Sequence, residues 1–259
     1  MDINKIREQL GKFKSSSSSS NILWKPQSGK SQIRIVEYKY DKSNPFVQMF
    51  FYFDIFSKPI LSPLSYGEPD PIDEFASKLY RTGSEKDKEL AKKLRPKVQF
   101  LVPIVVRGQE SEGVKVWSFG PQVANELKNI IEDPDYGDIT DVMKGHDITI
   151  EKLTPKEAGN QFGKTGIRAK PNKTPLHTDA SVVQKLLEDQ PNISEVFTKY
   201  TYEELKDMLK SYLNPTPKTD SDAQVDELFP NPEPASATLQ KSSRVANVQE
   251  AFDDIFDKI

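Results

Sequence analysis

Nearly all the aromatic and aliphatic residues of this 259-residue chain lie between positions 21 and 213. Only this stretch can build a hydrophobic core, because serine, proline and charged side chains dominate on either side of it. Beyond position 213, prolines at 215, 217, 230, 232 and 234 prevent any long regular element. We therefore predict three parts: an N-terminal arm over 1–20, a folded body over 21–213 and a Pro-rich tail over 214–259.

Runs of β-branched and aromatic residues in the body predict strands, and apolar residues at helical spacing predict helices. The expected strands cover 31–40, 46–56, 97–107 and 114–119, with a hairpin at 146–153 and 162–169. The expected helices cover 71–81, 84–94, 121–131, 179–189 and 201–213. Short strands interrupted by helices, without βαβ alternation, favour an α+β fold with a small β-barrel core, a helical insertion and C-terminal helices.

The formal net charge of −3 is unevenly distributed. Residues 216–259 carry −5 and the rest of the chain carries +2, so a mildly basic body precedes an acidic tail. Within the body, residues 78–107 hold nine bases and three acids, and this segment leads into a strand that bears Phe100. Cations that follow a phosphate backbone, beside aromatic rings on which bases stack, are what single-strand binding requires. The alternative is a solvated helix face beside core aromatics.

The end of the tail alternates acids with large apolar residues. Phe252, Ile255, Phe256 and Ile259 recur at the spacing of one helix face, between Asp253, Asp254 and Asp257. An acidic segment with an apolar stripe on a Pro-rich tether is typical of a peptide that folds when it binds a protein partner. The alternative is a tail that only adds solubility. The expected partner-binding residues are Phe252, Asp253, Asp254, Ile255, Phe256 and Asp257.

Signals for catalysis are weak. Residues 158–165 (AGNQFGKT) fit a permissive phosphate-loop pattern, but an alternating segment and Pro171 follow where a helix is needed, which favours a hairpin turn over a nucleotide site. Neither His146 nor His177 accompanies a nucleophile motif, and the acidic segment 133–141 lacks calcium-loop spacing. The chain has no cysteine, which excludes disulfides, thiolate zinc sites and cysteine nucleophiles. We predict no enzymatic activity.

No apolar run reaches the roughly 18 residues that a membrane span needs. The first residues, MDINKIREQLGKFK, contain no apolar segment of the kind that a secretory signal carries. We therefore expect neither membrane insertion nor secretion.

Several short motifs occur in an order that resembles the single-stranded DNA-binding, helix-destabilising proteins of T-even-type bacteriophages. They are Trp24-Lys25, Gln32-Ile33-Arg34-Ile35, Pro45-Phe46, Asp70-Pro71-Ile72-Asp73, Val105-Val106-Arg107 and Trp117-Ser118-Phe119-Gly120, with the acidic apolar C-terminus. The resemblance implies an OB-fold core with a cationic cleft for single-stranded DNA. The candidate DNA contacts are Lys30, Arg34, Tyr38, Arg81, Arg95, Lys97, Phe100, Arg107 and Trp117.

The resemblance also implies a basic arm that contacts the neighbouring protomer, so that the protein coats DNA cooperatively. The matching arm residues are Lys12, Lys14, Ser15 and Ser16. The acidic tail would recruit phage replication, recombination and repair proteins, in the cytoplasm of the infected bacterial host. The rival interpretation is a non-enzymatic scaffold that acts through its tail without nucleic acid.

One departure from this family concerns a metal. The resemblance implies a structural zinc held by cysteines and a histidine, but the corresponding segment here reads Asp70-Pro71-Ile72-Asp73. Structural zinc sites are usually built from Cys and His. We therefore predict that the zinc site is lost, that the protein has no cofactor, and that apolar packing holds the helical insertion.

Overall fold

The computed structural model describes residues 22–82, 84–214 and 252. The arm and nearly all of the tail lie outside these residues, and with them Lys12, Lys14, Ser15, Ser16, Asp253, Asp254, Ile255, Phe256 and Asp257. The described residues divide into two compact units. Unit 1 comprises 22–48 and 99–197, and unit 2 comprises 49–98, 198–214 and Phe252.

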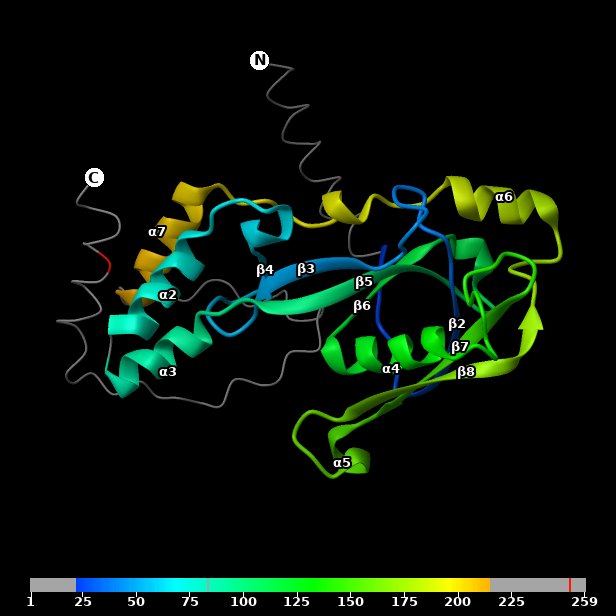
Figure 1. The fold of residues 1–259 in the computed structure, drawn as a ribbon, viewed down its shortest axis with the longest axis horizontal. Helices are drawn as coiled ribbons and strands as arrows, with labels where there is room; N and C mark the ends of the chain where they lie inside the picture. Colours follow the sequence, from blue (N-terminus) through cyan, green and yellow to red (C-terminus); the bar gives the residue numbers. More distant parts are fainter. Residues whose placement is uncertain (1–21, 83, 215–251, 253–259) are drawn as a thin grey trace, which may run out of the picture. The chain divides into compact units, whose positions relative to one another are not determined.

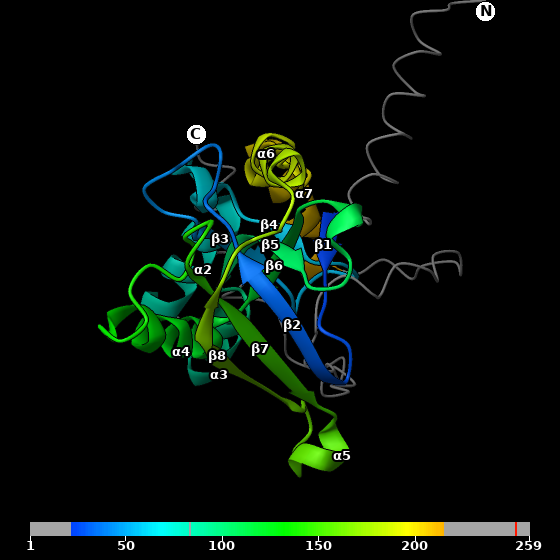
Figure 2. The same cartoon turned by 90° about the vertical axis from the view of Figure 1, so that its right-hand side faces the viewer.

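Unit 1 is built on a mixed sheet with the strand order β1-β6-β5-β2-β7-β8. The pairing of β1 with β6 is parallel, and the other pairings along this path are antiparallel. Figure 2 shows β2, β7 and β8 running side by side. The strands are β1 Leu23–Trp24, β2 Gly29–Ile35, β5 Lys97–Val106, β6 Lys115–Phe119, β7 Gly145–Leu153 and β8 Lys164–Thr174.

The alternation of residues in β2 sets the two faces of this sheet. Ile33 and Ile35 are fully buried and point into the core, so Lys30 and Arg34 point to the opposite side. Across the pairing register, Ile33 lies opposite Ile148, and Ile148 lies opposite Ala169. These rows form the inner face of the sheet.

Helices complete unit 1. Helix α4 (Pro121–Glu132) begins with Pro121 at its first position, which the fixed φ of proline favours, and it buries Val123 and Leu127 against the sheet core. The short helix α5 (Pro155–Ala158) lies at the end of the β7–β8 hairpin (Figure 1). Helix α6 (Ala180–Glu188) and the 3-10 turns η2 (Glu110–Glu112) and η3 (Ile193–Glu195) occupy the remaining connections.

Unit 2 is a helical cluster joined to a short hairpin. Strand β3 (Val47–Tyr52) begins in unit 1, continues into unit 2 and pairs there with β4 (Ile60–Leu61). Figure 1 shows helices α2, α3 and α7 gathered together, and they share one apolar cluster. The bounds are η1 Pro63–Tyr66, α2 Pro71–Thr82, α3 Glu85–Lys93 and α7 Tyr202–Leu213.

The structure confirms all five predicted helices, the central strands and the hairpin. The Ser84 side chain caps α3 and Asp87 closes the capping box. Two strands are shorter than expected: β2 ends at Ile35 rather than at 40, and β3 ends at Tyr52 rather than at 56. The architecture is α+β, as predicted. Within the described residues, no helix is both long enough and apolar enough to cross a membrane.

Candidate nucleic-acid interface

The Arg34 guanidinium, expected to contact DNA, is fully buried in unit 1. Its Nε donates to Asp147 Oδ1 at 2.9 Å, and its two terminal nitrogens donate to the backbone oxygens of Asp141 at 3.2 Å and Thr174 at 2.8 Å. Burial lowers the pKa of Arg34, although the Asp147 charge opposes this. Since every donor group has an internal acceptor, Arg34 is a structural residue that ties β2 to β7 and β8.

Arg107 shares the same carboxylate. Its Nε and Nη2 donate to Asp147 Oδ1 at 2.9 and 2.7 Å, and it also donates to the backbone oxygens of Pro175 and Leu176. Burial by itself raises the pKa of Asp147, but hydrogen bonds and charge from Arg107 and the charge of Arg34 outweigh burial and hold it below the usual value. Arg107 is therefore also committed to internal partners.

The aromatic residues expected in the cleft belong mostly to the core. Trp117 is 1% exposed and packs on Phe119 with ring centroids 4.5 Å apart. The half-buried Phe100 stacks on Phe119 at 6.3 Å. Tyr38 is 3% exposed, and its hydroxyl accepts a hydrogen bond of 2.9 Å from the Ile193 amide. Buried rings offer no face to a base, so Trp117 and Tyr38 are core residues rather than stacking platforms.

The remaining predicted cations lie at the surface. Arg95 contacts Asp73 at 2.6 Å and Lys97 contacts Asp54 at 2.7 Å, both within unit 2, and Arg81 is exposed in the last turn of α2. Exposed ion pairs of this kind contribute about 0–1 kcal/mol. Arg95 and Lys97 can therefore exchange their carboxylate partners for a phosphate.

A cationic face lies on the outer side of β2, β7 and β8 in unit 1. The pairing register puts Lys30 and Gly166 opposite Glu151, and Lys164 and Arg168 lie two residues to either side of Gly166. Since residues two apart share one side of a strand, these cations point away from the core. Lys30 has only a loose contact to Glu151, at 3.6 Å. We call the exposed residues Lys30, Lys164 and Arg168 the cationic sheet face.

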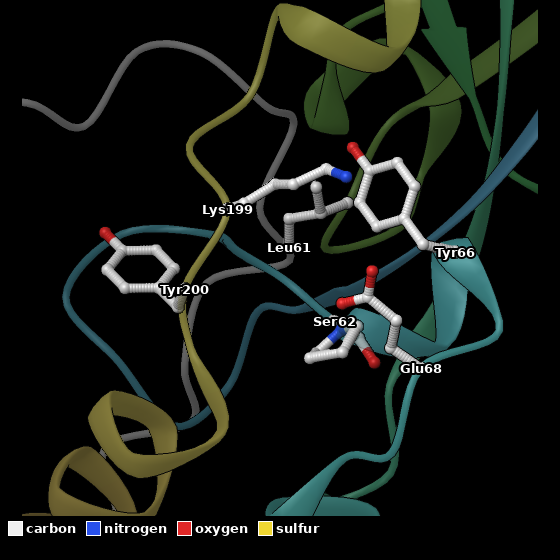
Figure 3. A pocket seen from close by; sticks show the side chains of 7 residues that line it. Leu61, Ser62, Tyr66, Glu68, Lys199 and Tyr200 are labelled. Carbon is white, nitrogen blue, oxygen red and sulfur yellow. The ribbon is translucent and has the colours of Figure 1, made fainter.

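A second cation–aromatic site lies in unit 2. The exposed Lys199, in the segment before α7, extends its amine toward the half-buried Tyr66 ring of η1, 3.5 Å from the ring centroid (Figure 3). The two residues line a small pocket together with Leu61, Ser62, Pro63, Glu68 and Tyr200. Burial, followed by the charge of Glu68, raises the pKa of Tyr66, so the ring remains neutral. An aromatic ring beside an exposed amine can stack a base and bind its phosphate.

Sequence reasoning missed most of these residues. Lys164 and Arg168 are four residues apart in the sequence of the predicted hairpin, so they lie on the same face of a strand. This spacing could have identified them. By contrast, Tyr66 and Lys199 are far apart in the sequence, and no local pattern joins them. The segment 158–165 connects α5 to β8, so a strand rather than a helix follows it, as predicted, and a phosphate loop is excluded.

A comparison with protein families shows to which family this chain belongs. A model of the family described as gp32 DNA binding protein like matches residues 27–214. The chain belongs to this family. The gp32-like match extends over the described residues of both units up to the end of α7, and it confirms the resemblance seen in the sequence. The family is one of DNA-binding proteins and not of enzymes. No curated protein matches the chain.

The zinc that the gp32-like resemblance implies does not fit the residues present. Asp70 is 1% exposed, and its Oδ2 accepts hydrogen bonds from the hydroxyls of Tyr52, at 2.9 Å, and Ser62. Its Oδ1 accepts from the amides of Ile72 and Asp73 at 2.9 and 3.3 Å, so Asp70 caps the start of α2. Burial raises the pKa of Asp70. With Asp73 paired to Arg95 and no cysteine in the chain, hydrogen bonds hold this segment.

Proposed function

We propose that this protein binds single-stranded DNA with little sequence preference. The observation that carries the proposal is the cationic sheet face of Lys30, Lys164 and Arg168 in a chain of a DNA-binding family. Cations on alternate residues of neighbouring strands can follow a phosphate backbone without reading bases. The Tyr66–Lys199 site adds a ring on which any base can stack. Arg81, Arg95 and Lys97 are proposed to supply further phosphate contacts from unit 2.

An OB-fold-like core is part of this proposal. The antiparallel order β6-β5-β2-β7-β8, with α4 packed on the inner face, supports it. OB-folds commonly bind single strands on an exposed strand face, and the cationic sheet face is such a surface.

The proposed activity is cooperative coating of DNA during phage replication, recombination and repair, without catalysis, in the cytoplasm of the infected host. In this proposal the arm contacts the neighbouring protomer through Lys12, Lys14, Ser15 and Ser16. Deleting 1–20 should abolish cooperativity on long DNA and leave the affinity for a very short oligonucleotide nearly unchanged. Equal cooperativity with and without the arm would contradict this role.

The acidic tail is proposed to bind replication and recombination proteins, and also to compete with DNA for the cations of the body. Opposite charges on a tether attract each other most strongly at low salt. Replacing Asp220, Asp222, Asp226, Glu227 and Glu233 by their amides should then tighten DNA binding at low salt. Unchanged or weaker affinity would exclude the competition. These substitutions leave Phe252, a core residue of unit 2, in place.

The experiment that tests single-strand binding is a titration of fluorescein-labelled oligo-dT, followed by anisotropy at several salt concentrations. Anisotropy is preferable to tryptophan quenching because Trp117 is buried. Tight binding that weakens with salt is expected, because bound cations displace counterions from the phosphates. Absence of binding, or affinity independent of salt, would favour the rival scaffold that acts through its tail alone. A titration with duplex DNA of the same length measures the preference for single strands.

A further inference from the structure

Phe252 lies in the core of unit 2, although it follows the end of α7 by a long Pro-rich connection. Its side chain is 2% exposed, and its ring packs edge-on against Phe75 of α2 with centroids 6.1 Å apart. The same cluster contains buried residues of α2, α3 and α7 and the C-cap residue of α3: Ile72, Phe75, Ala76, Leu79, Ala91, Leu94, Leu205 and Leu209. A residue of the predicted partner-binding stripe is therefore already bound within the protein.

We propose that the helical cluster of unit 2 is a receptor for the chain's own acidic C-terminal segment, residues 250–257, with Phe252 as the anchor. The site takes an acidic apolar peptide, and its occupant here is the tail of the same chain. A protein partner that binds the stripe through Phe252 must first displace it from this receptor. The tail therefore leaves the receptor in unit 2 when a protein partner binds the stripe in its place.

The length of the connection favours binding within one chain. Residues 215–251 join α7 to Phe252 within one chain. Two binding partners joined by a linker meet at effective concentrations that reach the millimolar range. A second copy would have to reach a comparable concentration to compete for the site. Docking within the chain is therefore favoured at ordinary protein concentrations.

Charge supports the same assignment. Ala91 of α3 and Leu94, which follows the end of α3, belong to the cluster that holds Phe252, and the exposed cations Lys92 and Lys93 stand between them in the sequence. In the tail, Glu250, Asp253 and Asp254 lie within two residues of Phe252. The opposite signs of these two sets of charges suit an acidic occupant of the cluster. Because a buried phenylalanine supplies the anchor, docking should persist in high salt, which separates it from competition with DNA.

Peptide binding tests the proposal. A fluorescein-labelled peptide of residues 246–259 is titrated into the full-length chain, either wild type or carrying Phe252→Ala. The Phe252→Ala chain, whose receptor is empty, should bind the peptide at least about tenfold more tightly than the wild type, which corresponds to about 1.4 kcal/mol. A peptide that itself carries Phe252→Ala should not bind. Equal affinity of both chains, or binding that does not need Phe252 in the peptide, would overturn the proposal.

The matched control is Phe229→Ala, which removes a phenylalanine from the tail outside the apolar stripe. This chain should behave like the wild type, and tight peptide binding to it would overturn the assignment to Phe252. Light scattering addresses docking between copies: a wild-type dimer that becomes monomeric in Phe252→Ala would overturn docking within the chain.

Hydrogen exchange in the unsubstituted chain provides a second test, which stands even if Phe252→Ala does not fold. Amides of residues 250–256 should exchange at least about tenfold more slowly than the unstructured rate, in high salt as well as low. Exchange at the unstructured rate would overturn the proposal.

Discussion

Arg34 and Asp147 form a buried ion pair that joins β2 to β7, with the Arg34 Nε donating to Asp147 Oδ1 at 2.9 Å. Replacing Arg34 by methionine leaves the carboxylate buried with only Arg107 and Gln32 as partners. Breaking a buried pair on one side destabilises a protein by about 3–5 kcal/mol. Urea unfolding should show a loss near the lower end of this range, because Arg107 remains.

Lys30→Ala provides the comparison, since Lys30 is exposed and its contact to Glu151 measures 3.6 Å. An exposed pair contributes about 0–1 kcal/mol, so this variant should unfold almost like the wild type. Equal losses in the two variants would show that Arg34 is not the structural residue that its burial indicates.

A glycine next to this pair has no room for a side chain. A Cβ on Gly145 would lie 2.4 Å from the Asp141 carbonyl oxygen and 2.8 Å from Arg34 Nη1. Gly145→Ala should therefore destabilise unit 1 by about 1–3 kcal/mol in urea unfolding, the usual range for overpacking. Gly166→Ala is the matched control, because its added Cβ meets no atom within 4 Å. A neutral Gly145→Ala would refute the packing described around Arg34.

The Asp147 network predicts how stability depends on pH. The folded-state pKa of Asp147 lies below its ordinary value of 3.8, so its ionised form is favoured by folding. The resulting stability is fully present above the unfolded-state pKa and is lost as the pH falls through the folded-state pKa. Urea unfolding at about pH 7, 5 and 3 should show this loss of stability only between pH 5 and pH 3. An Asp147→Asn chain should show a smaller loss there, and an identical pH profile would contradict the prediction.

Tyr66 should contribute to DNA affinity through stacking. Tyr66→Ala removes the ring that Lys199 covers at 3.5 Å, and loss of one stacked base weakens binding by about 1–3 kcal/mol. Anisotropy of labelled oligo-dT measures the effect. Tyr80→Ala is the control, because Tyr80 is 48% exposed on α2 and belongs to neither proposed site. Similar effects of the two substitutions would remove Tyr66 from the binding surface.

The sequence predicted local structure well where local chemistry decides it. The capping box of Ser84 and Asp87 starts α3, and the alternation in β2 places Arg34 on the side opposite Ile33 and Ile35. The error about Arg34 arose in tertiary packing, which the local sequence does not specify. The backbone around Asp141 and Thr174 covers the outer side of β2 at that point and supplies acceptors, and this depends on chain segments more than a hundred residues away.

Long-range packing also explains the other misses. The sequence around an aromatic residue in a strand is the same whether the ring stacks on a base or packs in the core. The neighbours of Trp117 in the sequence therefore could not show that it is a core residue. Phe252 lies beyond the Pro-rich connection, where composition places no core residue, yet it fills the cluster of α2 and α7. The pairing of Tyr66 with Lys199 likewise exists only in the folded chain.

The cationic sheet face is the most direct point at which to test single-strand binding. The measurement is the salt dependence of oligo-dT affinity for the triple variant Lys30→Ala, Lys164→Ala, Arg168→Ala, beside the wild type and Lys128→Ala, which removes an exposed cation from α4. Each phosphate contact adds about 0.7 to the slope of log affinity against log salt concentration for single strands. The triple variant should therefore show weaker binding and a slope smaller by about 2, while Lys128→Ala follows the wild type. An unchanged slope in the triple variant would contradict DNA binding on this face.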